Sequence, residues 1–308
     1  GWSPSMHHRL RKLKSQTSND FQLSPMFNWN IKHKELYSRV GALNILKSVL
    51  RIGGQTQQII SENLLPHIVY TIEDVEKLFR EWDRLVLKSP WSSSGRGVQI
   101  LRYGYLNASN RQWIASVLKQ QGYLMVEPLL KKLHDFSLHF HISPSGIRSL
   151  GLGSFTTNSN GRYIANDIFP EAKLIDDIIP VLDLQQILQH ALIENGVQNF
   201  YEGYAGDDLM VVDINGHSVI QPCVEINWRY NMGLVALRLQ KLLIGPDKGY
   251  FSVFVSPNET FGSFCERMKV QYEPKKHNGL PVSGFFPLTE FVGSQSGGYM
   301  VLGKEMPQ

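Results

Sequence analysis

A β-hairpin signal in the second half of this 308-residue chain restricts its fold more than any other feature. Two apolar segments flank the dipeptide Asn215-Gly216, which type I′ turns prefer because both central residues need a positive φ. A two-residue turn fixes the register of its strands. Ile214 is then expected to pair with His217, and Asp208 with Cys223. Because side chains alternate between faces along a strand, one face is predicted to carry Asp208, Cys223, Glu225 and Asn227.

The carboxylates of Asp208 and Glu225 and the amide of Asn227 form a set of hard oxygen ligands on this face. Such ligands suit Mg²⁺ (or Mn²⁺), which keeps coordinated water and takes its remaining ligands from phosphates. A surface face with scattered acids is the ordinary alternative for an isolated pair of acids. Here the strands lead into the polar and aromatic segment 227–233, and the pattern therefore favours the metal site.

A loop rich in Ser and Gly follows Lys88, which ends an apolar strand of the buried type. Glycine permits close approach of the backbone, and hydroxyl and amide groups donate hydrogen bonds to phosphate oxygens. Lys88 supplies a point charge for the same oxygens. The loop lacks the P-loop and dinucleotide-binding spacings, and taken alone it fits an exposed hairpin turn better. Its candidate phosphate-binding residues are Ser93, Ser94, Gly95 and Gly97.

A third pattern, Val126-Glu127-Pro128-Leu129, stands at the end of a predicted strand, and Asp135 follows a few residues later. An extended segment between two lobes can pair with the edge of adenine, and a carboxylate can accept hydrogen bonds from ribose hydroxyls. Glu-Pro is an equally good strand terminator. The loop, this segment and the acidic hairpin face, in that order along the chain, are more specific together than any one of them.

The other periodicities predict helices mixed with antiparallel strands. Apolar residues recur at helical spacing from Glu35 to Leu50, and Thr71 and Asp74 have the spacing of a capping box. Further helices are predicted from Ser109 to Gly122 and over 181–194. Strands are predicted over 84–88, 98–101, 123–126 and 136–142. This mixture indicates an α+β protein of two lobes.

Composition excludes several classes of protein. Hydrophobic residues make up 42% of the chain and charged residues 19%, the balance of a globular protein, and no apolar run reaches the length of a membrane helix. The two cysteines, Cys223 and Cys265, are far apart, which indicates a reducing cytoplasm. The net charge of +4 is mild, and the basic run from Arg9 to Lys14 lacks the aromatic residues of a nucleic-acid interface. We therefore expect neither a membrane nor a nucleic acid as partner.

Taken together, the three patterns resemble the ATP-grasp superfamily. The matching residues lie between about 36 and 235, and the most specific of them is the closing segment Glu225-Ile-Asn227-Trp-Arg229. The resemblance implies an ATP-grasp fold, in which two α+β lobes clasp ATP and Mg²⁺ (or Mn²⁺) bridges its phosphates. It also implies an ATP-dependent carbon–nitrogen ligase, which phosphorylates a small-molecule carboxylate to an acyl phosphate that an amine or similar nucleophile attacks.

The resemblance also implies a role for each matching residue. Lys88 would hold a phosphate and act in catalysis, with Ser93, Ser94, Gly95 and Gly97 as a mobile phosphate loop. Glu127 and Leu129 would contact adenine, and Asp135 ribose. Asp208, Glu225 and Asn227 would bind the metal, and Arg229 would steady the transferring phosphoryl group. Two positions depart from the family: Arg39 is the nearest candidate for a second lysine, and Asp135 stands where Glu is usual.

Domain boundaries follow from the same comparison with the superfamily. Residues 1–35 are polar and irregular, and we expect them to be a linker or the remnant of a preceding pre-ATP-grasp domain. The chain would then be a fragment of a longer protein. Residues 36–126 would form the N-terminal lobe of the grasp, and residues 127–308 the C-terminal lobe. The tail after Gly245 is expected to pack on the second lobe, and the sequence assigns no chemistry to it.

A few other residues have two interpretations. His139 and His141 share a strand face with Asp135 and could be a zinc pair, but partly solvated histidines are favoured because a third ligand is lacking. Arg162 and Asn166 lie in a polar loop and are weaker candidates for ligand contacts. Cys223 is expected to pack as a small residue.

Two other functions stay open beside the ligase. A grasp-type kinase would give a stable phosphorylated product without an amine, and a non-catalytic ATP-binding module would bind nucleotide without turnover. The sequence names neither the carboxylate, nor the amine, nor the oligomeric state, because a fold does not determine a substrate.

Overall fold

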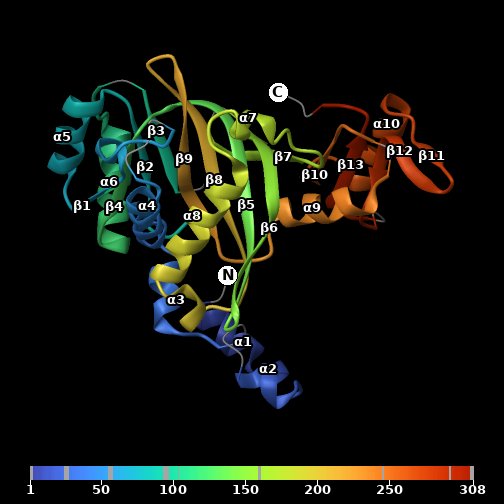
Figure 1. Ribbon diagram of the computed structural model, residues 1–308, viewed down its shortest axis with the longest axis horizontal. Helices are drawn as coiled ribbons and strands as arrows, with labels where there is room; N and C mark the ends of the chain where they lie inside the picture. The colour runs from blue at the N-terminus through green and yellow to red at the C-terminus, as the bar shows by residue number, and fades with distance from the viewer. Residues whose placement is uncertain are drawn as a thin grey trace.

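The computed structural model describes residues 3–23, 28–54, 58–92, 97–102, 104–158, 161–244, 246–290 and 293–305. The strands in these ranges form two antiparallel sheets, and helices cover them (Figure 1). The α+β fold predicted from the sequence is therefore confirmed. The domain boundaries at residues 35 and 126 stay a prediction.

The smaller sheet has four strands in the order β1-β4-β2-β3. Their bounds are β1 His67–Val69, β2 Leu85–Lys88, β3 Val98–Leu101 and β4 Leu124–Pro128. Leu85 and Leu87 point from β2 into a core with helices α5 (Ile72–Trp82) and α6 (Ala108–Gln121). Because side chains alternate along a strand, Val86 and Lys88 point to the opposite face, toward the larger sheet.

The caps of these two helices explain where they begin. Thr71 and Asp74 form the predicted capping box of α5. Helix α6 begins at Ala108, because the side chain of Asn107 accepts the N–H of Asn110 at 2.9 Å. The prediction that Ser109 opens this helix was therefore wrong by two positions, since Asn107 is as good a cap as serine.

The larger sheet has nine strands in the order β11-β12-β13-β10-β7-β6-β5-β8-β9. Its central strands are β5 Lys131–Ser143, β6 Gly146–Thr157, β7 Tyr163–Asp167, β8 Gly203–Ile214 and β9 His217–Asn227. Phe136, Leu138 and Phe140 point from β5 into the main core, which includes residues of α4 (Arg39–Gly53) and α8 (Val181–Glu194). Asp135 and His139 point to the other face, where helix α9 (Met232–Leu242) packs.

The C-terminal strands extend the sheet away from the smaller one (Figure 1). Their core is aromatic and includes Phe261, Phe264 and Phe285. The elements of this region are β10 Gly249–Val255, α10 Phe261–Gln271, β11 Lys275–His277, β12 Leu280–Pro287 and β13 Ser296–Leu302. The short helix α7 (Lys173–Asp176) instead contributes Ile175 to the main core.

The N-terminal region differs from the expected irregular linker. It forms α1 (Pro4–Lys14), α2 (Asn19–Leu23) and α3 (Ile31–Leu36), which lie outside the two sheets (Figure 1). Caps explain the difference, because the side chains of Ser3 and Asn30 accept backbone N–H groups in the first turns of α1 and α3. Ser38 likewise caps α4 and divides the single helix predicted over Glu35–Leu50 in two.

The hairpin of β8 and β9 has the predicted turn but not the predicted register. Asn215 and Gly216 have φ values of 54° and 86°, and Ile214 pairs with His217. Farther along, Asp208 pairs with Glu225 and not with Cys223, because Leu209 alone faces the three residues Pro222, Cys223 and Val224. A proline lacks the N–H that a regular ladder requires and is accommodated in such a bulge.

The bulge carries Cys223 away from the acidic face. Its Sγ donates to the carbonyl of Ala42 at 3.5 Å, inside the main core. The prediction that Cys223 shares a face with Asp208 was therefore wrong, although its expected role as a packing residue agrees with this burial. None of the helices within the described ranges has the length and apolar character that a membrane span requires.

Candidate functional site

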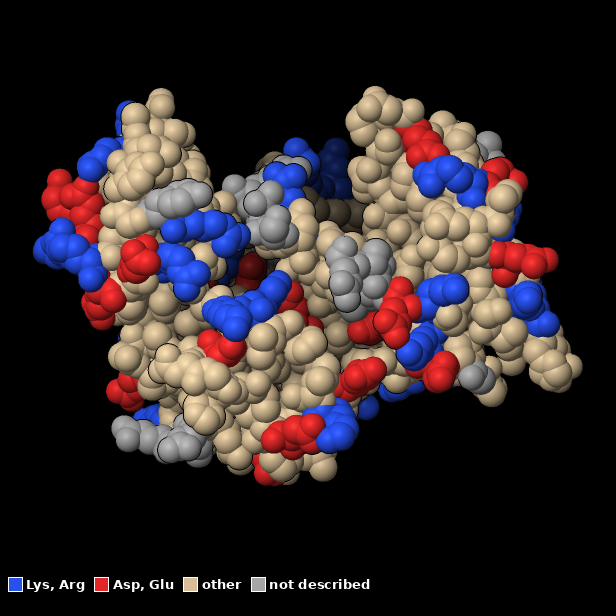
Figure 2. Space-filling model, turned by 90° about the horizontal axis from the view of Figure 1, so that it is seen from above, with Lys and Arg blue, Asp and Glu red and all other residues tan. Residues whose placement is uncertain are grey.

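A pocket of about 560 Å³ lies between the two sheets. The surface is hollowed in the middle of the molecule, and charged side chains line the hollow (Figure 2). The pocket brings together seven residues that the sequence analysis singled out: Arg39, Lys88, Glu127, Leu129, Asp135, Asp208 and Glu225. Its apolar lining includes Val86, Ile100 and Met210, which come from both sheets.

Lys88 and Glu127 form an ion pair on neighbouring strands of the smaller sheet. Both side chains are largely buried, with 8% and 16% of their surface exposed. Removal from water strengthens the attraction between them. An anionic ligand must therefore compete with Glu127 for the Lys88 ammonium group.

Arg39 connects the loop after β2 to the acidic face of the larger sheet. Its Nη1 lies 3.1 Å from Glu225 Oε2, and its Nη2 donates to Ser92 Oγ at 3.2 Å. Its Nε donates to the carbonyl of Ser89 at 3.1 Å. Only 9% of the Arg39 side chain is exposed. Burial and these three contacts hold its guanidinium group in place. Arg39 was predicted to bind nucleotide, but no sequence pattern indicated these contacts.

Part of the predicted phosphate loop, namely Ser93, Ser94 and Gly95, lies outside the described residues. Gly97 closes the loop, and its carbonyl accepts the N–H of Ser89 at 2.7 Å. A Cβ at Gly97 would lie 1.9 Å from Ser89 Oγ, so a larger residue does not fit here. The carbonyl of Arg84 accepts the N–H of Leu129 at 2.9 Å, and Leu129 lines the pocket.

The acidic face consists of Asp208 and Glu225, which are cross-strand partners. Asn227 Nδ2 donates to Asp208 Oδ2 at 2.9 Å, and Arg229 Nη1 donates to Asn227 Oδ1. Burial, together with the charges of Glu225 and Asp135, raises the pKa of Asp208 well above its usual range. A nearby cation would lower the electrostatic cost of ionising Asp208.

These residues fit Mg²⁺, a cation that keeps part of its hydration shell when it binds to proteins. Asp208 and Glu225 supply hard oxygen atoms, and the pocket that they line has room for phosphates and water. Asn227 does not line the pocket and lies beside it, through its hydrogen bond to Asp208. Among the described residues no three His, Cys, Asp or Glu side chains converge on one position. The carboxylates of Asp208 and Glu225, on neighbouring strands, could hold such a cation from one side.

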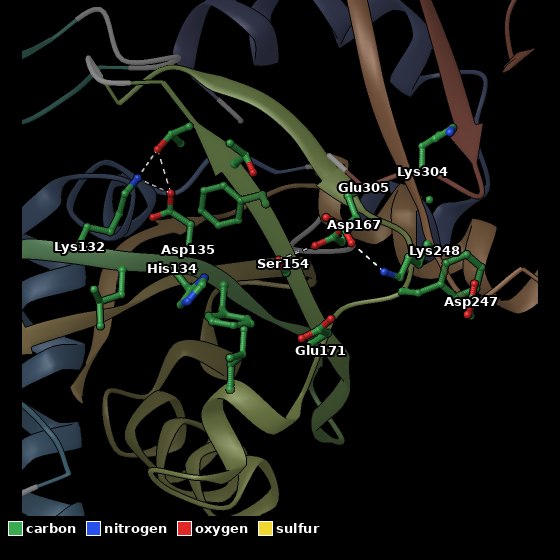
Figure 3. Close-up of a pocket in the computed structure, with 18 residues that line it drawn as sticks. Lys132, His134, Asp135, Ser154, Asp167, Glu171, Asp247, Lys248, Lys304 and Glu305 are labelled. Carbon is green, nitrogen blue, oxygen red and sulfur yellow. Dashed lines mark hydrogen bonds and ion pairs between the residues drawn. The ribbon is translucent and has the colours of Figure 1, made fainter. Parts of the chain in front are cut away.

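Asp135 is engaged by its neighbours at the border of the pocket (Figure 3). Thr157 Oγ1 donates to Asp135 Oδ2 at 2.8 Å, and Lys132 Nζ forms an ion pair with the same oxygen. Neither partner could be predicted from the sequence, because neither belongs to a motif and Thr157 comes from β6. The predicted contact of Asp135 with ribose stays a prediction.

His139 is enclosed and does not resemble a metal ligand. Its Nε2 shares a hydrogen bond of 2.9 Å with Ser137 Oγ, and burial lowers its pKa to about 4. Three glycines surround the ring, since a Cβ at each of them would lie 3.0 Å or less from an imidazole atom: Gly153, Gly206 and Gly233. His141 packs against Tyr204 instead, with ring centroids 4.9 Å apart. The expectation of two partly solvated histidines was wrong for His139, which is 1% exposed.

The two weaker candidates do not line this pocket. Arg162 is exposed, and its backbone N–H donates to Asn158 Oδ1 at 3.0 Å. Asn166 is buried, and its side chain donates to the carbonyl of Ser154 at 3.3 Å and accepts from Tyr163. Their roles as ligand contacts stay predictions.

Comparison with known proteins gives a fold but no close relative. Neither a model of a known protein family nor a curated protein sequence matches the chain. Its structure resembles N5-carboxyaminoimidazole synthetase from Staphylococcus aureus, complexed with ADP, with a TM-score of 0.52, 11% identity, and coverage of 88% of this chain and 68% of the synthetase. It resembles the βγ-ATP complex of biotin carboxylase from Campylobacter jejuni with a TM-score of 0.50 and 12% identity, over 86% of this chain and 63% of the carboxylase.

A third similar structure is pyruvate carboxylase from Rhizobium etli, with a TM-score of 0.54 and 10% identity, over 88% of this chain and 26% of that much longer chain. The chain thus spans less than two thirds of two of these three enzymes. All three contain the ATP-grasp fold, and the likeness shows that this chain has the same fold.

Proposed function

We propose that the chain is an Mg-ATP-dependent ligase that activates a carboxylate as an acyl phosphate for attack by an amine or similar nucleophile. One observation carries the proposal, namely that Lys88, Glu127, Asp135, Asp208 and Glu225 line one pocket between the two sheets. The likeness in fold to a synthetase complexed with ADP and to a carboxylase complexed with βγ-ATP supports it.

The pocket offers different surroundings to the two ends of a nucleotide. Val86, Ile100 and Leu129 provide an apolar site for adenine, beside the carboxylate of Glu127. Lys88 and Arg39 provide positive charge for phosphates. Asp135 would then reach toward ribose, but only if it gives up Lys132 or accepts a further hydrogen bond.

The acidic face lies where the phosphate end of this nucleotide would be. Asp208, Glu225 and Asn227 would hold Mg²⁺, which neutralises phosphate charge when it is bound. The hydrogen bond from Arg229 to Asn227 holds the guanidinium beside these ligands. Arg229 would therefore stabilise the negative charge of the transferring phosphoryl group.

The proposed reaction has two steps. An oxygen of the substrate carboxylate attacks the γ-phosphorus, the bond from that phosphorus to the bridging oxygen breaks, and ADP leaves. The amine nitrogen then attacks the acyl carbon, the carbon–oxygen bond to phosphate breaks, and the nitrogen loses a proton. The products are an amide, ADP and phosphate. The side chains of Lys88, Arg39 and Arg229 bind and orient the phosphates throughout.

A non-catalytic ATP-binding module is the second candidate, and the ion pairs of the pocket favour it. Lys88 is neutralised by Glu127, and Asp135 by Lys132. A nucleotide must break these pairs in order to bind, so the groups are not arranged in advance for phosphoryl transfer. A kinase would use the same phosphate site but would need no amine.

An assay of ADP release separates these candidates. The full chain is incubated with Mg-ATP and panels of carboxylates and amines, and products are identified by mass spectrometry. The ligase predicts ADP release that needs both substrates and yields an amide, and Glu225→Gln abolishes it. Glu81→Gln is the matched control, since Glu81 is exposed on α5. A phosphorylated product that forms without amine would show a kinase, and ATP binding without any ADP release would show a binding module.

A further inference from the structure

Two regions adjoin the pocket proposed for nucleotide, which we call the nucleotide pocket. One of them is a second pocket of about 570 Å³, which also includes Asp167 (Figure 3). The two pockets share four lining residues: Lys132, Asp135, Phe155 and Thr157. Asp208 and Glu225, where phosphoryl transfer is proposed, do not line the second pocket. The substrate that accepts the phosphoryl group must therefore bind elsewhere, beside the acidic face.

The face of β8 that carries Asp208 continues to an aromatic group formed by Tyr204, Tyr230 and His141. Asp208, Gly206 and Tyr204 occupy alternate positions of the strand, so they share one face of the sheet. His141 is the cross-strand partner of Tyr204 on β5. At a rise of about 3.4 Å per residue, Tyr204 lies about 13 Å along the strand from Asp208. The aromatic group is therefore the next surface that a ligand meets beyond the acidic face.

The aromatic group is ordered on one side and exposed on the other. The rings of Tyr204 and Tyr230 meet edge to face, with centroids 5.1 Å apart and an interplanar angle of 83°. His141 contacts the same Tyr204 ring, with centroids 4.9 Å apart. Tyr230 nevertheless remains 48% exposed, and Met232, two residues later, is exposed as well. A tyrosine held in this way offers its free surface to an apolar ligand.

Arg229 connects the aromatic group to the acidic face. It precedes Tyr230 in the chain, and its Nη1 donates to Asn227 Oδ1. Asn227 in turn donates to Asp208 Oδ2 at 2.9 Å. Within the part of the chain that the structure describes, the bond to Asn227 is the one hydrogen bond of this guanidinium. Because a guanidinium has five N–H groups, most of its donors remain for an anionic ligand such as a carboxylate.

Each of these features has an ordinary explanation when it stands alone, because exposed aromatic side chains and solvated arginines are common on protein surfaces. Here the exposed ring of Tyr230, the donors of Arg229 and the acidic face of Asp208 follow one another on one side of the sheet. An anion on a flat apolar body matches this order, since the anion meets Arg229 and the body meets Tyr230. A cationic body matches it less well, because Arg229 repels it.

We propose that the substrate of the ligase is an aromatic carboxylic acid, whose carboxylate lies at Arg229 and whose ring packs against Tyr230 and Tyr204. The proposal rests on the ligase function proposed above and adds the chemical class of its carboxylate substrate. A carboxylate is ionised at neutral pH, so its oxygen attacks the γ-phosphorus without a base. The bond from that phosphorus to the bridging oxygen breaks, and ADP leaves.

The test uses three probes that separate the ring from the charge: phenylacetate, acetate and 2-phenylethanol. Binding of each to the full chain is measured by ligand-observed NMR, with Mg-ADP present, and Mg-ATP is titrated on the same preparation. Phenylacetate is expected to bind. Acetate is expected to bind about tenfold more weakly because it lacks the ring, and 2-phenylethanol about tenfold more weakly because it lacks the charge.

Variants locate the ring and the charge separately. Tyr230→Ala is expected to weaken phenylacetate about tenfold and to leave acetate unchanged, whereas Tyr230→Phe should retain the affinity for phenylacetate. Tyr204→Ala, which removes the second ring, should act in the same direction as Tyr230→Ala. Arg229→Gln is expected to remove the preference for phenylacetate over 2-phenylethanol. Tyr105→Ala, at an exposed tyrosine before α6, is the matched control.

The Mg-ATP titration distinguishes the two levels of failure. If Mg-ATP binds but phenylacetate does not, the substrate class is wrong and the ligase proposal stands. Equal affinity for acetate and phenylacetate, preference for 2-phenylethanol, or unchanged binding of phenylacetate in both alanine variants at Tyr230 and Tyr204 would overturn the substrate class in the same way. If Mg-ATP itself does not bind, the proposed function is wrong, and with it the basis of this inference.

Discussion

The two adjoining pockets have almost the same volume, about 560 Å³ and about 570 Å³, but they are built in different ways. The nucleotide pocket draws its polar residues from short motifs, such as Glu127 to Leu129 and the acidic strand that ends at Asn227. The second pocket takes its charges from four segments that no motif connects, from Lys132 to Glu305. Chemistry held by a local motif is visible in a sequence, whereas chemistry assembled by strand order is not.

The strongest test of this contrast removes a charge from the nucleotide pocket. Glu225→Gln is expected to lower turnover by about 100-fold or more, because it removes a candidate metal ligand and the partner of Arg39. Asp167→Asn should leave the affinity for Mg-ATP unchanged, since Asp167 lines the second pocket and does not line the nucleotide pocket. Steady-state ADP release and nucleotide titration on both variants check this. Equal loss of nucleotide affinity in the two variants would show that the pockets are not separate.

A second prediction concerns His139, whose ring lies under the first turn of α9. His139→Ala is expected to lower the free energy of unfolding by about 2 to 4 kcal/mol, because it leaves a cavity among packed glycines. Denaturant unfolding measures the change. His141→Ala, on the same strand face, is the control and should cost less, since His141 is only partly buried. A cost below that of the control would mean that the ring is not a packing element.

The pH dependence of stability gives an independent test of the same residue. The pKa of His139 falls to about 4 in the folded protein. As the pH falls below 6.5, the imidazole is therefore protonated in the unfolded chain but stays neutral in the folded protein. Stability from this residue is therefore full above pH 6.5 and is lost as the pH falls toward 4, by about 3 kcal/mol. His139→Gln should flatten that part of the curve, and an unchanged curve would contradict the burial of the ring.

Gly233→Ala is expected to have a smaller effect on the same contact. A Cβ at Gly233 would lie 2.4 Å from His139 Nε2, so the start of α9 must shift, at a cost of about 1 to 3 kcal/mol. Thermal unfolding checks this against Gly104→Ala, where a Cβ meets its nearest atom at 3.4 Å. Equal melting temperatures of the two variants would show that the ring can move aside.

The acid of the second pocket should behave in the opposite sense to His139. The pKa of Asp167 rises to about 6 on folding, so the stability that its neutral form contributes is present below pH 3.8 and is lost as the pH rises through 6. Asp167→Asn is then expected to stabilise the protein at pH 7 by about 1 kcal/mol, after allowance for partial exposure. The gain should vanish near pH 4. Destabilisation at pH 7 would show that Asp167 already has a stabilising partner.

How far the sequence predicted this molecule depends on the range over which each feature is determined. The turn at Asn215-Gly216 and the capping box at Thr71 were predicted because each is set by a few adjacent residues. The pairing of Asp208 was not, because the regular register expected from the turn was continued through Pro222, where the bulge changes it. The N-terminal helices were not predicted, because their few apolar residues show no helical periodicity. Capping residues such as Ser3 determine where these helices begin.

The candidate site shows the same division. Seven predicted residues do line one pocket, although they come from both sheets and, in the case of Arg39, from helix α4. The partners that hold these residues were not predicted, such as Thr157 at Asp135 and Ser92 at Arg39. Each contact joins segments that are far apart in the sequence or belong to no motif, so no local pattern predicts it.

The most direct test of the central claim is calorimetric titration of ATP, with and without Mg²⁺, on the native chain and on Lys88→Ala and Glu225→Ala, with Asp183→Asn, at an exposed acid on α8, as control. We expect binding that requires Mg²⁺, that weakens at least tenfold in the first two variants and that is unchanged in the control. Binding that is unaffected by both substitutions, or no binding to the native chain, would contradict the assignment of this pocket to Mg-ATP.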